Sequence, residues 1–137
     1  MTVQVVARKE NEGPNNPAFN GIQKIQWDWT ADSVSGVIVA SLVAGENPTT
    51  QYKFSGQLVR LITKPGTGDD APSAGYDVTI LDEDSFDVLM GAGLNRSATL
   101  PEQVLGSSLG TIQYSTLSLR VADAGVSNKG TVIVYII

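Results

Sequence analysis

The sequence predicts an all-β protein, a two-sheet sandwich or jelly roll of about seven or eight strands with very little helix. Three observations support this fold class. Several short segments alternate apolar with polar residues, which is typical of strands that bury one face. The same segments are rich in β-branched residues, which favour strands over helices. The chain also has 14 glycines in 137 residues, spread between these segments where turns are needed.

The clearest strand lies in residues 22–30, where Trp27 and Trp29 alternate with Gln26 and Asp28. Because successive side chains of a strand point to opposite faces, both tryptophans are expected in the core and Asp28 toward solvent. An acid beside aromatic residues also suggests a glycoside hydrolase, but that chemistry needs two carboxylates facing each other across a cleft. The alternation therefore favours a core or interface role for Trp27 and Trp29.

Further strands are expected along the chain at 34–43, 52–64, 76–80, 111–121 and 130–137. Gly56 is expected to form a bulge or bend within its strand. The last two strands are joined by DAGVSNKG, a connector full of turn-forming residues, and are expected to pair as a hairpin. Helical character is limited to a turn or two in 86–94 and in 101–106.

The hydrophobic core is expected to contain Trp27, Trp29, Val37, Phe54, Leu58, Ile62, Val78, Ile80, Leu119, Val121, Val132 and Val134. Burial of Val132 and Val134 leaves Ile133 and Tyr135 on the opposite face of the last strand. That second face is also apolar, and an isolated domain rarely exposes such a surface. We therefore expect Ile133 and Tyr135 to be covered by the N-terminal segment or by a neighbouring subunit.

The chain is predicted to divide into an extended N-terminal arm, residues 1–21, and a single β-sandwich domain, residues 22–137. Pro14 and Pro17 forbid a regular helix in the arm and disfavour a central strand. The extended TVQVVA stretch can add to a neighbour's sheet edge, because strand addition needs mainly backbone hydrogen bonds. The interface candidates are apolar residues of the arm and of the last strand: Val3, Val5, Phe19, Ile133 and Tyr135.

The composition excludes several classes of function. The chain has no histidine and no cysteine, which excludes a histidine acid–base relay, a disulfide, and a metal site built from thiolates or imidazoles. We expect no enzyme activity and no cofactor. The net charge of −5 disfavours a nucleic-acid partner, which would favour a basic surface. We expect no membrane partner, because the longest apolar runs fall far short of the roughly 20 residues that span a bilayer.

Acidic residues are concentrated in residues 69–87, which hold seven of the 14 aspartates and glutamates of the chain. A calcium site is one interpretation, because hard cations bind several carboxylate oxygens. However, the stretch lacks the glycine and the later glutamate of an EF-hand loop. Aspartate is also favoured in turns, where its side chain accepts hydrogen bonds from nearby backbone amides. We therefore expect a solvated loop and turn without a tightly bound metal.

Two stretches carry a pattern of turn-forming residues: GYDVTILDEDSFDVLMGAGLNRS in residues 75–97, and LSLRVADAGVSNKGTVIVYII in residues 117–137. They resemble small β-rich structural proteins of tailed bacteriophages, in which "YDVT-L-DEDG-DVL-GAG-NRS" and "L-V-NAG--K-G-V-LYI" stretches recur. Ser85 stands where members of that family often carry glycine. The matching positions are Tyr76, Asp77, Val78, Asp82, Glu83, Asp84, Asp87, Val88, Gly91, Gly93, Asn95, Arg96, Ala124, Gly125, Lys129, Gly130 and Tyr135.

The resemblance implies a virion protein, assembled in the host cytoplasm, that decorates or cements the head shell. Its partners would be the major capsid protein and further copies of the chain, with tail and head–tail components as other possibilities. A second interpretation is a β-sandwich module that binds carbohydrate or a host surface. A shallow row of exposed Trp27, Trp29, Tyr52 or Tyr114 would favour sugar binding, whereas burial of these residues would favour the structural role.

Overall fold

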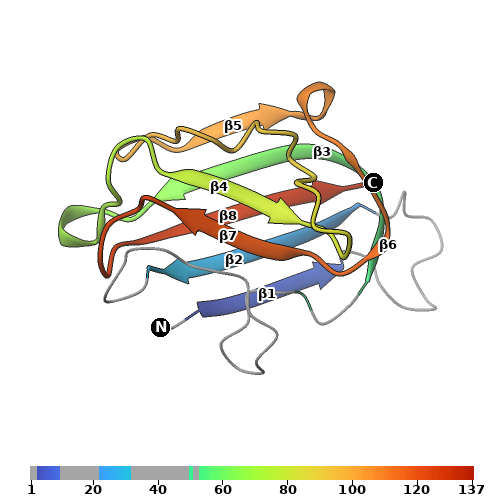
Figure 1. Ribbon diagram of the computed structural model, residues 1–137, viewed down its shortest axis with the longest axis horizontal. Coiled ribbons are helices and arrows are strands. Elements are labelled where there is room, and N and C mark those ends of the chain that lie inside the picture. The colour runs from blue at the N-terminus through green and yellow to red at the C-terminus, as the bar shows by residue number, and fades with distance from the viewer. Residues whose placement is uncertain (1–2, 10–21, 32–49, 51–52) are drawn as a thin grey trace.

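The computed structural model describes residues 3–9 (backbone only), 22–31, 50 and 53–137, and this part of the chain is an all-β sandwich (Figure 1). The larger antiparallel sheet has the order β1 (Val3–Lys9), β2 (Gln23–Thr30), β8 (Lys129–Ile136), β3 (Phe54–Pro65) and β5 (Glu102–Leu105), and β6 (Thr111–Ser115) also pairs with β3. The smaller sheet pairs β4 (Asp77–Leu81) with β7 (Ser118–Ala122). Helical structure in the described residues is limited to two 3-10 turns, η1 (Gly68–Asp70) and η2 (Gly106–Ser108). The predicted fold class is confirmed, and no helix in these residues is long and apolar enough to cross a membrane.

Strand β3 organises the larger sheet because its 12 residues pair with three other strands. It pairs with β8 on one edge, while β6 and then β5 follow each other along the other edge. The pairing with β6 shifts register between Phe54 and Gly56, and Gly56 has φ +140°. The bulge or bend expected at Gly56 is therefore confirmed.

A second register shift in β3 corrects one expected core residue. The pairing with β8 is irregular between Leu58 and Arg60, so the residues after this bulge change faces. Leu58 and Leu61 are fully buried between the sheets, while Ile62 is half-buried and its side chain lies on the outer face. The prediction that Ile62 is a core residue was wrong, because simple alternation does not allow for the extra residue.

The two tryptophans of β2 lie in the core, as their alternation predicted. Trp27 and Trp29 are fully buried, and the ring of Trp29 lies 5.7 Å from that of Tyr76, which precedes β4. Burial raises the pKa of the Tyr76 hydroxyl. The other described residues expected in the core are buried as well: Phe54, Leu58, Val78, Ile80, Leu119, Val121, Val132 and Val134. Val37 and the strand expected at 34–43 lie outside the described residues.

The last two strands do not form the expected hairpin. Strand β7 pairs with β4 in the smaller sheet, whereas β8 lies between β2 and β3 in the larger one. Their connector is an arch between layers, in which Asp123, Gly125 and Ser127 all adopt positive φ. The expected strand 111–121 is likewise divided into β6 and β7, and the helical turn expected in 101–106 is largely strand β5. Turn-forming residues predict that a chain reverses direction, but the packing of both sheets decides which strands pair.

The described part of the expected N-terminal arm is an edge strand of the chain's own sheet. Strand β1 pairs with β2 along its whole length, from Val3 opposite Trp29 to Lys9 opposite Gln23. This placement differs from an arm that reaches a neighbour. The rest of residues 1–21, including Phe19, lies outside the described residues.

The two layers are also joined along one side by backbone hydrogen bonds. The Val88 N–H donates to the Ile80 carbonyl (2.8 Å), and the Gly110 N–H donates to the Val88 carbonyl (2.9 Å). The Leu58 N–H then donates to the Gly110 carbonyl (3.2 Å). Since Ile80 lies in β4 and Leu58 in β3, the segment around Val88 is fixed to both sheets.

Candidate functional site

The residues of the first recurring stretch form one hydrogen-bonded unit beside β4. The Val78 N–H donates to the Gly93 carbonyl (2.8 Å), and the Arg96 N–H donates to the Tyr76 carbonyl (2.7 Å). The Asn95 N–H donates to the carboxylate of Asp77 (2.9 Å). Residues 86–96 therefore run beside β4 as a series of turns, joined to its two ends by isolated bridges, and the hydrogen bonds within them agree with the turn or two expected in 86–94. They hold the acidic turn (residues 82–90) at one end of the smaller sheet.

Asp82 closes the acidic turn. Its Oδ1 accepts hydrogen bonds from the backbone N–H groups of Asp84 (2.9 Å) and Phe86 (3.0 Å). The Asp82 N–H donates to the Phe86 carbonyl (3.0 Å), and the Ser85 N–H donates to the Asp82 carbonyl (3.0 Å). This geometry confirms the prediction of a turn in which an aspartate side chain binds nearby amides.

Ser85 has φ +67°, a conformation that favours glycine. We expect Ser85→Gly to raise the free energy of unfolding by about 0.5–1 kcal/mol, because relief of strain outweighs the added freedom of the unfolded chain. Urea unfolding measures the change. Ser107→Gly, in η2 and without positive φ, is the matched control and should lower stability slightly. Equal effects of the two substitutions would contradict the expectation.

Both oxygens of the Asp87 carboxylate accept hydrogen bonds from the backbone. Its Oδ1 accepts from the N–H groups of Ile80 (3.2 Å) and Leu89 (3.0 Å), and its Oδ2 accepts from Gly91 N–H (2.9 Å). These contacts fix the chain immediately after the acidic turn. In the described residues no three acidic side chains come close enough to hold a metal ion.

Glu83 binds the acidic turn to the connection between β6 and β7. The Ser115 hydroxyl accepts the Glu83 N–H (2.9 Å), and Glu83 Oε1 accepts the Thr116 N–H (3.3 Å). The Lys53 ammonium lies 3.3 Å from the same carboxylate oxygen. The Thr116 backbone hydrogen bond, followed by Lys53, holds the pKa of Glu83 below its ordinary value.

A lowered pKa in the folded state means that ionised Glu83 stabilises the fold above its unfolded pKa and that this contribution disappears as the pH falls through the folded pKa. We therefore expect the melting temperature of the wild type to fall more between pH 7 and pH 3 than that of Glu83→Gln. Thermal unfolding at both pH values measures the difference. Because the group is exposed, 1 M salt should reduce the difference through screening of Lys53. An equal fall in melting temperature for the wild type and Glu83→Gln would contradict this role of ionised Glu83.

A polar hollow of about 560 Å³ lies between the acidic turn and β6. Asp82, Glu83 and Asp84 line one side, while Gln113 and Tyr114 are among the β6 residues on the other. Tyr114 is 68% exposed, and the Lys53 ammonium lies 5.0 Å from its ring centre. The hollow thus combines carboxylates and an amide with one accessible aromatic ring.

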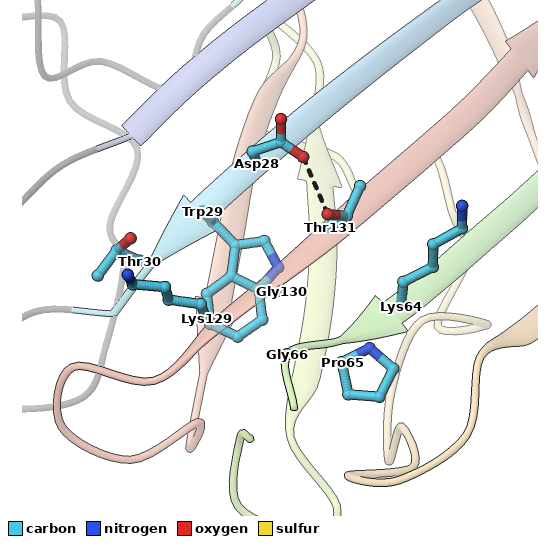
Figure 2. A pocket seen from close by; sticks show the side chains of 9 residues that line it. All are labelled: Asp28, Trp29, Thr30, Lys64, Pro65, Gly66, Lys129, Gly130 and Thr131. Atoms are coloured by element: carbon cyan, nitrogen blue, oxygen red, sulfur yellow. Dashed lines mark hydrogen bonds between the residues drawn. The ribbon is translucent and has the colours of Figure 1, made fainter. Parts of the chain in front are cut away.

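A second hollow, of about 330 Å³, lies on the outer face of the larger sheet where β2, β8 and β3 meet (Figure 2). Figure 2 shows Asp28 and Thr131 joined by a hydrogen bond, in which the Thr131 hydroxyl donates to Asp28 Oδ1 (2.9 Å). The amide of Gln26 donates to the same oxygen (3.1 Å). Asp28 points outward as predicted, and it is the one carboxylate among the nine lining residues. The lining of this hollow therefore lacks the second acid of a glycoside hydrolase.

The interface candidates occupy different parts of the larger sheet. Ile133 and Tyr135 lie on its outer face, where Ile133 is 3% exposed and Tyr135 is half-buried. The Arg60 guanidinium lies 5.7 Å from the Tyr135 ring centre, so a neighbouring side chain of the same sheet contributes to its cover. Val3 and Val5 stand at the register positions opposite Trp29 and Trp27. Their role in an interface stays a prediction.

Two exposed apolar residues of the acidic turn were not predicted as interface residues. Phe86 and Met90 are each 72% exposed, although their segment is fixed to the backbone of β4 on either side. The signal was present in the sequence, because both residues lie in a short apolar stretch with weak helical spacing and no strand alternation.

The chain matches no protein-family model, and comparisons with curated proteins and with solved structures find no match.

Proposed function

We propose that this protein is a non-enzymatic structural component of a phage virion, of the kind that decorates or cements the head shell. Its partners are the major capsid protein and further copies of the chain. The observation that supports the proposal is the hydrogen-bonded unit of residues 76–96. Of the two stretches that resemble phage structural proteins, the one in this unit holds more of the matching positions.

This unit presents a contact surface and contains no reaction chemistry. The carboxylates of Asp77, Asp82 and Asp87 bind backbone amides and so determine the shape of the loop. The loop in turn exposes Phe86 and Met90 on a fixed backbone. Large apolar side chains on a backbone that is fixed before binding are typical of contact residues, because little backbone entropy is lost when the partner binds.

Purified particles of the source phage test the proposal. Quantitative mass spectrometry should find the chain at a fixed ratio to the major capsid protein. Shells that lack the chain should bind the purified wild-type protein, and Phe86→Ser should bind at least tenfold more weakly with an unchanged melting temperature. Absence of the chain from washed particles would overturn the proposal.

A carbohydrate-binding role is the second candidate, and the polar hollow beside Tyr114 is the observation that favours it. Trp27 and Trp29 are buried, so they cannot form the expected row of stacking residues, and Tyr52 lies outside the described residues. Tyr114 retains an exposed ring beside hydrogen-bonding groups. A glycan array with wild type and Tyr114→Ala tests this role, and binding that depends on Tyr114 would favour it over the structural proposal.

A further inference from the structure

The outer face of the larger sheet is basic, although the chain carries a net charge of −5. Four of the nine lysines and arginines lie on this face, which we call the basic face: Lys24, Arg60, Lys64 and Lys129. Arg8, in β1, stands at the register position opposite Lys24. Asp28 is the one carboxylate on the outward positions of β2, β8 and β3, and it already accepts two hydrogen bonds. Positive charge is therefore concentrated on one side of an acidic protein.

The register of the sheet explains why these basic residues lie together. Lys24 and Arg60 both stand opposite Tyr135, and Lys64 stands opposite Thr131. Side chains at directly opposed positions share a face of the sheet. The basic residues therefore surround a partly apolar centre formed by Ile62 and Tyr135.

The basic face is also hollowed. Lys64 lines both the hollow of about 330 Å³ seen in Figure 2 and a neighbouring one of about 350 Å³. The second hollow is also lined by Arg60, Ile62, Pro101, Glu102 and Gln103. Arg60 is held between the two partners already described, because its Nε donates to Gln103 (2.9 Å) while its guanidinium covers Tyr135. The surface thus offers two recesses, each lined by two basic side chains and one carboxylate, and the second recess has Ile62 as an apolar wall.

The acidic turn has the complementary chemistry. Phe86 and Met90 are exposed there, and Glu83, Asp84 and Asp87 lie in the same nine residues. No lysine or arginine occurs between residues 65 and 95. Among the described residues, the Lys53 ammonium pairs with Glu83 of the turn (3.3 Å), which leaves the carboxylate of Asp84 available to a partner. An exposed ring and thioether flanked by carboxylates fit a recess with an apolar wall and a basic rim.

We propose that the acidic turn of one copy docks on the basic face of a second copy. The turn belongs to the layer of β4, and the basic face is the outward side of the other layer, so one molecule cannot join its own two surfaces (Figure 1). The two surfaces differ, so the contact is head-to-tail and repeats into a ring or an open array. The inference rests on the proposed function for its biological setting, because a shell protein acts as an assembly.

A second copy fits better than a nucleic acid. The net charge of −5 repels a polyanion at long range, whereas the acidic turn supplies a local negative charge on a compact, shaped surface.

Sedimentation velocity on the full chain tests the contact over a range of concentrations, at 20 mM and at 500 mM salt. The wild type should associate, and high salt should weaken the association.

Charge reversals identify the two surfaces. Lys64→Glu and Asp84→Lys each exchange the charge of an exposed side chain, and each should raise the self-association Kd by about tenfold. The double variant Lys64→Glu/Asp84→Lys should recover most of the loss, because the exchanged charges again attract. Arg120→Glu, on β7, and Asp69→Lys, in η1, are exposed matched controls and should leave the Kd unchanged.

A wild type that stays monomeric at low salt would overturn the inference, as would control variants that weaken association as much as the test variants. Failure of the double variant to recover association would overturn the pairing of these two surfaces. Binding of duplex DNA that Lys64→Glu abolishes, without self-association, would assign the basic face to nucleic acid. These measurements use the purified chain alone, so their outcome does not depend on whether the chain is detected in phage particles.

Discussion

Gly130→Ala is expected to lower the free energy of unfolding by about 3 kcal/mol. A Cβ at this position would lie 2.5 Å from Cζ2 and 2.7 Å from Cε2 of Trp29, and 3.0 Å from the Lys64 carbonyl oxygen. The indole ring crosses Gly130 in Figure 2. Strand β8 is paired on both edges, so the backbone cannot move away from the ring without breaking hydrogen bonds to β2 or β3.

Urea unfolding of Gly130→Ala and of Gly68→Ala measures this effect against a matched control. Gly68 has φ +60° but no atom within 4 Å of the added Cβ, so its substitution should cost only about 1 kcal/mol of backbone strain. Trp29→Phe makes room at Gly130, and the double variant should cost at least 1 kcal/mol less than the sum of the single variants. If the losses in unfolding free energy of the two single variants add up to that of the double variant, Trp29 is not the source of the clash.

The second large effect is expected at Asp87, where substitution by alanine should cost about 3 kcal/mol. The change leaves the N–H groups of Ile80 and Leu89 without their acceptor in a partly buried part of the chain, and it also removes the acceptor of the exposed Gly91 N–H. Removal of the acceptor from a buried hydrogen bond leaves its donor unsatisfied and desolvated, and here two such donors depend on one carboxylate.

Asp87→Asn distinguishes the effect of losing hydrogen bonds from the effect of losing the side chain, because asparagine has almost the same shape as aspartate. Asparagine keeps one carbonyl oxygen but places an NH₂ donor against one of the backbone N–H groups, so we expect about half the loss seen for alanine. Asp69→Ala, at an exposed acid without a side-chain hydrogen bond among the described residues, should change stability by less than about 0.5 kcal/mol. The order wild type, asparagine, alanine in urea midpoints is the expected result, and equal midpoints for Asp87→Ala and Asp69→Ala would contradict it.

Local patterns predicted those features that depend on neighbouring residues in the chain. The alternation in residues 22–30 placed Trp27 and Trp29 in the core, and the affinity of aspartate for backbone amides predicted the turn at Asp82. Both outcomes are governed by side-chain direction over two or three residues.

Features that depend on distant residues were not predictable in the same way. The bulge after Leu58 arises from the pairing of β3 with β8, which is more than 70 positions away, and it moved Ile62 to the outer face. The arch between β7 and β8 resembles a hairpin connector in composition, yet its ends lie in different sheets. The basic face likewise depends on register, since Lys24, Arg60 and Lys64 become neighbours only through β8.

The central place of β8 has a consequence for the order in which the protein folds. Among the described strands, β8 alone joins the β1–β2 pair to the group of β3, β5 and β6. Asp28 and Thr131, which it brings into contact, are 103 positions apart. Until residues 129–136 are available, the larger sheet cannot be completed, and the edges of β2 and β3 that pair with β8 stay open. Since such long loops must close before the sheet is complete, we expect folding among the slower β topologies, at about milliseconds to seconds, with strand edges exposed until β8 is in place.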